Sequence, residues 1–204
     1  MLGAALILAL AYLCGSIPTG VLLSARHGVD PRDIGSGNIG ATNVARTAGT
    51  RVGILTLIGD ALKGLLPVLL AARLGFDEVT VALTGLAAFG GHLFSCFLRF
   101  RGGKGVATAL GVLLGLAPFA MAIVVPTFVV IVAATRYVSL ASMAMAVLTA
   151  PLLVVLGYPY STIAAAMVMG LFIVVRHRDN IRRIRFGTES RIGSRRTRAD
   201  DGLA

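Results

Sequence analysis

The sequence predicts an all-α integral membrane protein with about seven transmembrane helices. Its 204 residues are 56% hydrophobic and only 14% charged, and the mean hydropathy is +0.87. About a quarter of the residues in soluble chains are charged, and a chain this apolar lacks the polar atoms to cover a surface in water. The composition therefore excludes soluble enzymes and disordered chains, and two cysteines are too few for a disulfide scaffold.

Apolar runs between charged residues predict the helices in order. The expected spans are 2–24, 52–72, 79–98, 105–117, 119–135, 138–156 and 160–175. The fourth and fifth share one apolar stretch, which as a single helix would be about 45 Å long and exceed a hydrocarbon core of about 30 Å. Pro118 predicts the break between them. The first run is expected to stay as a mature span, because no basic residue precedes it and no small-x-small cleavage site follows.

The distribution of basic residues predicts the orientation. With seven spans and the N-terminus outside, seventeen of the nineteen lysines and arginines fall in cytoplasmic segments, Arg73 lies outside and Lys63 lies within a span. Six spans would export Arg136 and the basic C-terminus. We therefore expect a cytoplasmic C-terminus, one membrane domain over residues 1–190, and a basic, disordered tail over 191–204.

Three polar segments fall at the cytoplasmic ends of predicted helices and are expected to form one site. The first, 35–46, combines glycines, whose backbone N–H groups converge on an anion, with neutral donors and an arginine. The alternative is an ordinary connecting loop rich in glycine and asparagine. The candidate phosphate-binding residues of this segment are Ser36, Gly37, Asn38, Gly40, Thr42, Asn43 and Arg46.

The second segment, 101–108, opens a predicted helix. Glycines and a lysine at a helix N-terminus favour an anion. The segment is not a Walker A loop, because that motif needs a preceding strand and a Ser or Thr directly after the lysine. The alternative is a glycine-rich flank that only sets orientation. The candidate phosphate-binding residues are Gly102, Gly103, Lys104, Gly105 and Thr108.

The third segment, 176–183, follows the last span. If the helix continues through it, His177, Asn180 and Ile181 share one face, which turns His177 and Asn180 toward the site. Arg176 is the candidate phosphate ligand of this segment. The later arginines favour a polybasic anchor at the lipid headgroups.

Three ionisable residues lie inside predicted spans. Asp60 and Lys63 are three residues apart and should face each other in the protein interior, as a structural ion pair that supports the site rather than as catalysts. His92 is expected to pack or form a hydrogen bond rather than act as a ligand. Scattered histidines without an intramembrane carboxylate pair predict no metal site, and no cofactor or nucleic-acid partner is expected.

These motifs together resemble one family. The combination of Gly35-Ser36-Gly37-Asn38-x-Gly40-Ala41-Thr42-Asn43-x-x-Arg46, Gly102-Gly103-Lys104-Gly105-Val106-Ala107-Thr108 and Arg176-His177-x-x-Asn180-Ile181-x-Arg183 is similar to the bacterial acyl-phosphate:glycerol-3-phosphate acyltransferase family (PlsY). The H-x-x-x-x-D signature of the common glycerolipid acyltransferases is absent. The resemblance runs nearly end to end, through Asp60-x-x-Lys63-Gly64 and Gly187-Thr188-Glu189.

The resemblance implies a multi-pass enzyme of the bacterial inner membrane with its active site at the cytoplasmic face. It would transfer a fatty acyl group from acyl phosphate to the sn-1 hydroxyl of glycerol 3-phosphate, giving lysophosphatidic acid and phosphate as the first acylation of phospholipid synthesis. The implied partners are these two substrates and membrane lipid, with neither acyl-CoA nor acyl-carrier protein as direct donor.

The implied catalytic residues are Ser36, Arg46, Lys104, His177 and Asn180. An acyl phosphate is already activated, so positioning and charge neutralisation suffice without a covalent intermediate. His177 accepts the glycerol proton or only orients that substrate, with a substrate phosphate oxygen as the base; the sequence leaves both open. The competing function is an anion carrier or lipid-phosphate flippase, which usually places its site at the midplane between repeated halves.

Overall fold

The computed structural model describes residues 1–193, and over that range the chain forms helices and no strands. The predicted all-α class is therefore confirmed for this part of the chain. In order, the helices are α1 (Leu2–Ser16), α2 (Thr19–Ala25), α3 (Ala41–Thr47), α4 (Thr50–Arg73), α5 (Glu78–Leu93), α6 (Val106–Leu116), α7 (Pro118–Thr135), α8 (Val138–Val155), α9 (Tyr160–Arg176) and α10 (Arg178–Arg185).

The helix breaks follow local chemistry. Pro18 separates α1 from α2, because proline has no N–H to continue the helix ladder. Pro118 is the first residue of α7, so the break predicted in the long apolar stretch is confirmed. The predicted span 79–98 corresponds to the span Glu78–Leu98, within which α5 stops at Leu93 and a separate 3-10 turn, Cys96–Leu98, follows.

Seven apolar helical segments follow one another along the chain, but not all of them are long enough to span a membrane. Five segments are long and apolar enough: α1 with α2, α4, α5 with its following turn, α7 and α8. A sixth is α9 with α10, if this pair, bent by 54°, counts as one span. The predicted count of seven is not reached by this criterion, because the 11 residues of α6 extend only about 16 Å.

Glycines allow two pairs of helices to approach closely. A Cβ on Gly15 would overlap the Ala88 carbonyl of α5, and one on Gly111 would overlap the Ala61 carbonyl of α4. Small residues are the usual means of close helix packing in lipid. Because α6 lies against α4 in this way, its short apolar segment is shielded by protein.

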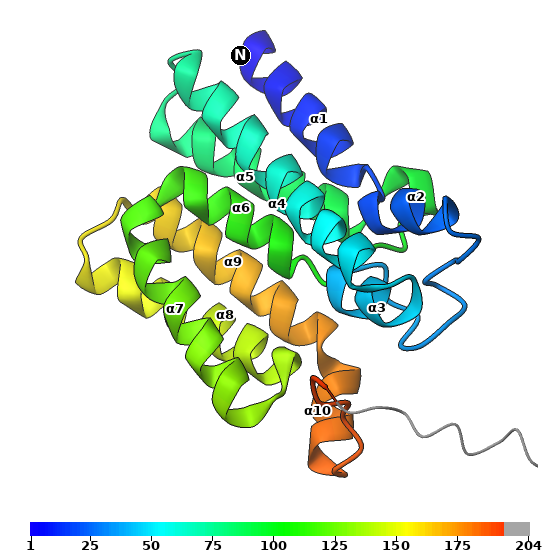
Figure 1. Cartoon of the computed structure of the whole chain (residues 1–204). Helices are drawn as coiled ribbons and strands as arrows, with labels where there is room; N and C mark the ends of the chain where they lie inside the picture. The colour runs from blue at the N-terminus through cyan, green and yellow to red at the C-terminus, as the bar shows by residue number, and fades with distance from the viewer. Residues whose placement is uncertain (194–204) are drawn as a thin grey trace, which may run out of the picture.

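The helices run alternately between two ends of the molecule (Figure 1). The N-terminus and the turn between α4 and α5 lie at one end. The short helices α3 and α10 and the turn between α7 and α8 lie at the other. The fold thus brings the polar segments of the sequence to one end of an apolar bundle.

Candidate active site

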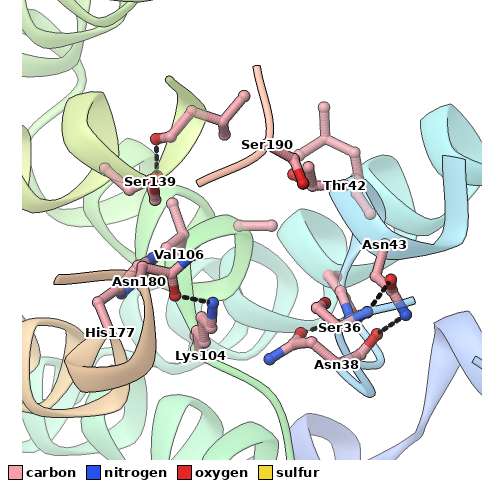
Figure 2. Close-up of a pocket in the computed structure, with 18 of the residues that line it drawn as sticks. Ser36, Asn38, Thr42, Asn43, Lys104, Val106, Ser139, His177, Asn180 and Ser190 are labelled. Atoms are coloured by element: carbon pink, nitrogen blue, oxygen red, sulfur yellow. Dashed lines mark hydrogen bonds between the residues drawn. The ribbon is translucent and has the colours of Figure 1, made fainter. Parts of the chain in front are cut away.

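A cavity of about 160 Å³ lies where the polar segments meet (Figure 2). Its walls come from α3 on one side and from the start of α6, from α8 and from the α9–α10 junction on the other. The predicted site residues that line it are Ser36, Asn38, Gly40, Thr42, Asn43, Arg46, Asp60, His92, Lys104, Gly105, His177 and Asn180. Three segments far apart in sequence therefore surround one polar space.

Asn43 folds the first segment around its own side chain. Its amide donates to the carbonyls of Pro31 (2.8 Å), Ile34 (3.1 Å) and Asn38 (2.9 Å), and its Oδ1 accepts the backbone N–H of Ser36 (2.9 Å). These bonds use both amide hydrogens of a side chain that is only 2% exposed. Asn43 is therefore committed to holding the loop, although it was predicted as a phosphate ligand.

The loop that Asn43 organises leaves Ser36, Thr42 and Arg46 lining the cavity. Gly35 and Gly37 both have φ of +69°, the left-handed region in which a side chain is strained. The guanidinium of Arg46, from α3, reaches the Ser190 carbonyl at 3.5 Å. Gly37, a predicted phosphate ligand, does not line the cavity and serves the turn instead.

The second segment places one charged group in the cavity. Lys104 Nζ donates to Asn180 Oδ1 and thereby connects the loop to α10 (Figure 2). Burial lowers the pKa of Lys104 to about 8, and the positive charge of Arg183 adds to this effect. A buried ammonium with positive neighbours favours an anionic ligand, because a phosphate would restore its charge balance.

Gly102 and Gly103, which precede Lys104, do not lie at the cavity where they were predicted to bind phosphate. The N–H of Gly102 donates to the Leu93 carbonyl (3.1 Å), and that of Gly103 donates to the His92 carbonyl (3.2 Å). A Cβ on Gly103 would overlap His92 Nε2. Neither glycine lines the cavity, so their role is to seat the loop on the end of α5. Thr108 is fully buried and also lies outside the lining.

The third segment is broken at His177, contrary to the helix continuation used to predict its faces. The axis turns by 54° between α9 and α10, and His177 and Asn180 are buried while Ile181 is 44% exposed. His177 Nδ1 lies 2.8 Å from the Ile173 carbonyl, which accepts only, so Nδ1 carries the hydrogen and Nε2 is the acceptor. Burial lowers the pKa of His177 to about 4, despite the opposing bond to Ile173.

Glu189 is the important residue that the prediction of the site left out. Its carboxylate accepts from Ser139 Oγ (2.7 Å), Asn180 Nδ2 (2.6 Å) and Arg183 Nε (2.6 Å). Burial raises the pKa of Glu189, but these three hydrogen bonds outweigh it and keep the pKa below its usual value. Glu189 orients Asn180, which in turn binds Lys104. A lone carboxylate beyond the last helix carries no spacing that reveals this role in the sequence.

Asp60 and Lys63 form the predicted ion pair inside the protein. Lys63 Nζ lies 2.8 Å from Asp60 Oδ1 and also donates to the Ile17 carbonyl at the break between α1 and α2 (2.8 Å). His92 Nδ1 lies 3.7 Å from the same carboxylate oxygen. Asp60 and His92 line the cavity and Lys63 does not, so this cluster forms its inner floor.

Arg176 lies outside the cavity lining, although it was predicted as a phosphate ligand. Its guanidinium donates to the Leu93 carbonyl (2.5 Å) and lies 4.9 Å from the centre of the Phe94 ring. The Leu93 carbonyl also accepts the N–H of Gly102. Arg176 therefore ties α9 to the same end of α5 on which the Lys104 loop is seated.

A partly apolar groove of about 870 Å³ adjoins the cavity and shares part of its wall. Ile54 and Leu57 of α4 line one side, and Phe128 and Val132 of α7 line the other. Arg46 and Glu189 border both spaces. Over residues 1–193, no group of three His, Cys, Asp or Glu side chains is placed to hold a metal ion.

The fold and the site define a protein of membrane-spanning helices with a cationic cavity beside a partly apolar groove. The sequence profile of the glycerol-3-phosphate acyltransferase family matches residues 5–187, and the chain belongs to this family. The family predicted from the motifs is therefore confirmed.

Relatives and solved structures agree with this assignment. The chain is 51% identical over 191 residues to a glycerol-3-phosphate acyltransferase of Geobacter sulfurreducens, covering 94% of this chain and 98% of that one. Its identity to the enzyme of Geotalea daltonii is 54% over 180 residues, with 88% and 93% covered. The crystal structure of PlsY, an integral membrane glycerol 3-phosphate acyltransferase, in its glycerol 3-phosphate form superposes with a TM-score of 0.90 at 42% identity, covering 94% and 96%. The lysophosphatidic acid form gives 0.88 at 41%.

Proposed function

We propose that the protein transfers a fatty acyl group from acyl phosphate to the sn-1 hydroxyl of glycerol 3-phosphate. The observation that carries this proposal is the direct contact between a cavity with cationic walls and a groove whose sides, from α4 and α7, are apolar. Both substrates carry a phosphate and one also carries an acyl chain. The two adjoining spaces match these requirements.

In the proposed reaction, Arg46 and Lys104 hold the two phosphates, and Ser36, Asn38 and Thr42 contribute hydrogen bonds from the cavity wall. The glycerol oxygen attacks the carbonyl carbon, the bond from that carbon to the bridging oxygen breaks, and phosphate leaves with the electron pair. Charge neutralisation of the leaving phosphate lowers the barrier. The products are lysophosphatidic acid and inorganic phosphate.

His177 orients the glycerol hydroxyl in this scheme rather than serving as the base. A pKa of about 4 keeps the imidazole neutral at pH 7, so Nε2 is a hydrogen-bond acceptor but a weak base. A phosphate oxygen, whose second pKa is about 6, is better matched to accept the proton. Asn180, held by Glu189, fixes the position of Lys104 during the transfer.

We further propose seven membrane passes in the bacterial inner membrane, with the N-terminus outside and the site at the cytoplasmic face. The basic residues that flank the cavity end of the bundle support this orientation through the positive-inside rule. Single cysteines at Leu74 and Arg185, in a background without Cys14 and Cys96, test it. An impermeant thiol reagent on intact cells should label position 74 and not 185. Labelling of position 185 from outside would reverse the orientation.

The reaction is tested with purified protein and palmitoyl phosphate. Phosphate should be released together with lysophosphatidic acid only when glycerol 3-phosphate is present, and palmitoyl-CoA or palmitoyl-acyl-carrier protein should not replace the donor. Lysophosphatidic acid formation from palmitoyl-CoA at a comparable rate would contradict the proposed donor.

A further inference from the structure

The segment that follows α10, residues 188–193, forms a wall shared by the cavity and the groove. Glu189 and Ser190 line the cavity, and all six residues line the groove. We call this segment the C-terminal wall. Thr188 and Ser190 line the groove and are also exposed.

The C-terminal wall is attached to the turn between α7 and α8. The N–H of Ile192 donates to the Arg136 carbonyl (2.9 Å), and Arg136 Nε and one of its terminal nitrogens donate to the Ile192 carbonyl (3.0 and 2.7 Å). Arg191 Nε donates to the Tyr137 hydroxyl (3.0 Å), and its guanidinium lies 5.0 Å from the centre of the Tyr137 ring. Arg191 and Ile192 belong to the tail, 191–204, that was predicted to be disordered. Residues 191–193 are held here, and the rest of that tail lies outside the described residues.

The attachment has consequences inside the cavity. Ser139, at the start of α8, donates to Glu189, and Arg46 of α3 reaches the Ser190 carbonyl. The wall therefore bridges α3 and α8 across the mouth of the groove. The bonds that hold its outer end involve exposed groups, which contribute little to global stability but set how often a segment opens locally.

An acyl phosphate needs such a wall. It reacts with water as well as with an alcohol: the water oxygen bonds to the carbonyl carbon, the bond to the bridging oxygen breaks, and a proton passes to solution, giving fatty acid and phosphate. Excluding water is a general means of protecting a reactive group in a site. A wall that opened often would allow this loss.

We infer that the C-terminal wall decides whether the acyl group goes to glycerol 3-phosphate or to water, and that Arg136 and Tyr137 are positioning residues that hold it closed. The inference rests on the proposed acyl phosphate donor. Arg136 and Tyr137 line neither the cavity nor the groove; they act through Ile192 and Arg191.

The test measures two products from palmitoyl phosphate with glycerol 3-phosphate present: total phosphate and lysophosphatidic acid. In the unmodified protein they should form in nearly equal amounts, and the small excess of phosphate over lysophosphatidic acid measures the fatty acid formed by hydrolysis. Arg136→Ala removes both side-chain bonds to Ile192 and should raise the ratio of fatty acid to lysophosphatidic acid roughly tenfold, the scale set by about one lost hydrogen bond. Tyr137→Phe removes only the hydroxyl and should move the ratio less, in the same direction.

Arg185→Ala is the matched control, because it removes an exposed arginine from α10 that no described contact joins to the wall. Its product ratio should equal that of the unmodified protein. If Arg136→Ala lowers both products in parallel, or leaves the ratio unchanged, the inference is overturned and the attachment is only structural. If Arg136→Ala cannot be purified folded, Arg191→Ala tests the other contact with the same readout.

The same measurements test the proposed function independently of the role of the C-terminal wall. If the unmodified protein releases no phosphate from palmitoyl phosphate, the donor is wrong, whatever the variants do. If it releases phosphate and lysophosphatidic acid in nearly equal amounts but Arg136→Ala and Arg191→Ala keep that ratio, only the role of the wall is refuted.

Discussion

Asp60 and Glu189 each gather polar partners at the cavity, but in different surroundings. The donor bonded to Asp60 is Lys63 of its own helix, and both side chains lie deep within the bundle, 3% and 5% exposed. The donors to Glu189 come from α8 and α10, and Glu189 itself lies on a segment held by exposed contacts. The comparison indicates that Asp60 stabilises the interior of the bundle, whereas Glu189 joins α8 and α10 at the site.

The largest effect is expected from Asp60→Leu. It leaves the buried ammonium of Lys63 without its partner, and breaking such a pair costs about 3–5 kcal/mol. The thermal unfolding midpoint in detergent should fall sharply. The double variant Asp60→Leu/Lys63→Met should recover much of the loss, because no charge is then buried unpaired. Equal midpoints for the single and double variants would contradict the structural role.

Lys104→Met should follow, with kcat/KM lowered roughly 10²- to 10³-fold at pH values below the Lys104 pKa of about 8. The lysine is the charged donor that the Glu189 network orients, through Asn180. The unfolding midpoint should change little, in contrast to Asp60→Leu. Arg101→Met is the matched control, since Arg101 is an exposed residue of the same loop outside the cavity lining. A similar loss in both variants would show that the position of Lys104 is not special.

Glu189→Gln should lower kcat/KM roughly 10- to 100-fold, as expected for losing charge-assisted hydrogen bonds. Activity should suffer more than stability, the reverse of Asp60→Leu. Steady-state kinetics and thermal unfolding on the same preparations measure both. The comparison of the two carboxylates breaks down if Glu189→Gln unfolds as readily as Asp60→Leu.

A smaller and more diagnostic effect is expected in the pH dependence. With a pKa of about 8, Lys104 loses its proton as the pH rises through that value, so kcat/KM should fall on the alkaline side. The negative charge of Glu189 raises the pKa of Lys104, so Glu189→Gln should move this limb to lower pH. An unmoved limb would mean that another group is titrating.

The smallest effect is expected from His177→Asn. With a pKa of about 4, His177 does not change its charge between pH 6 and pH 8. The variant should therefore keep the shape of the pH profile in that range, with a loss of only a few fold from poorer orientation. A wild-type acidic limb that disappears in His177→Asn would make His177 the base.

Much of the fold follows from hydropathy alone. In lipid, every backbone polar group must be satisfied within the segment, so long apolar runs form helices wherever they occur. Pro118 marks a break because proline cannot continue the hydrogen-bond ladder, and that break lies where the sequence places it. The bend at His177 carries no such signal, so the continuous helix that was the condition for a shared face of His177, Asn180 and Ile181 does not form.

The sequence by itself determined which residue types meet: glycines, Lys104, Arg46, His177 and Asn180 at one end of an apolar bundle. Only the tertiary structure decided which of them face the cavity. Gly102, Gly103 and Asn43 use their N–H groups within the protein, and Arg176 donates to the Leu93 carbonyl. The physical reason is that a donor satisfied by a buried carbonyl is no longer available to a ligand, and partners such as Glu189 are brought close by packing rather than by sequence spacing.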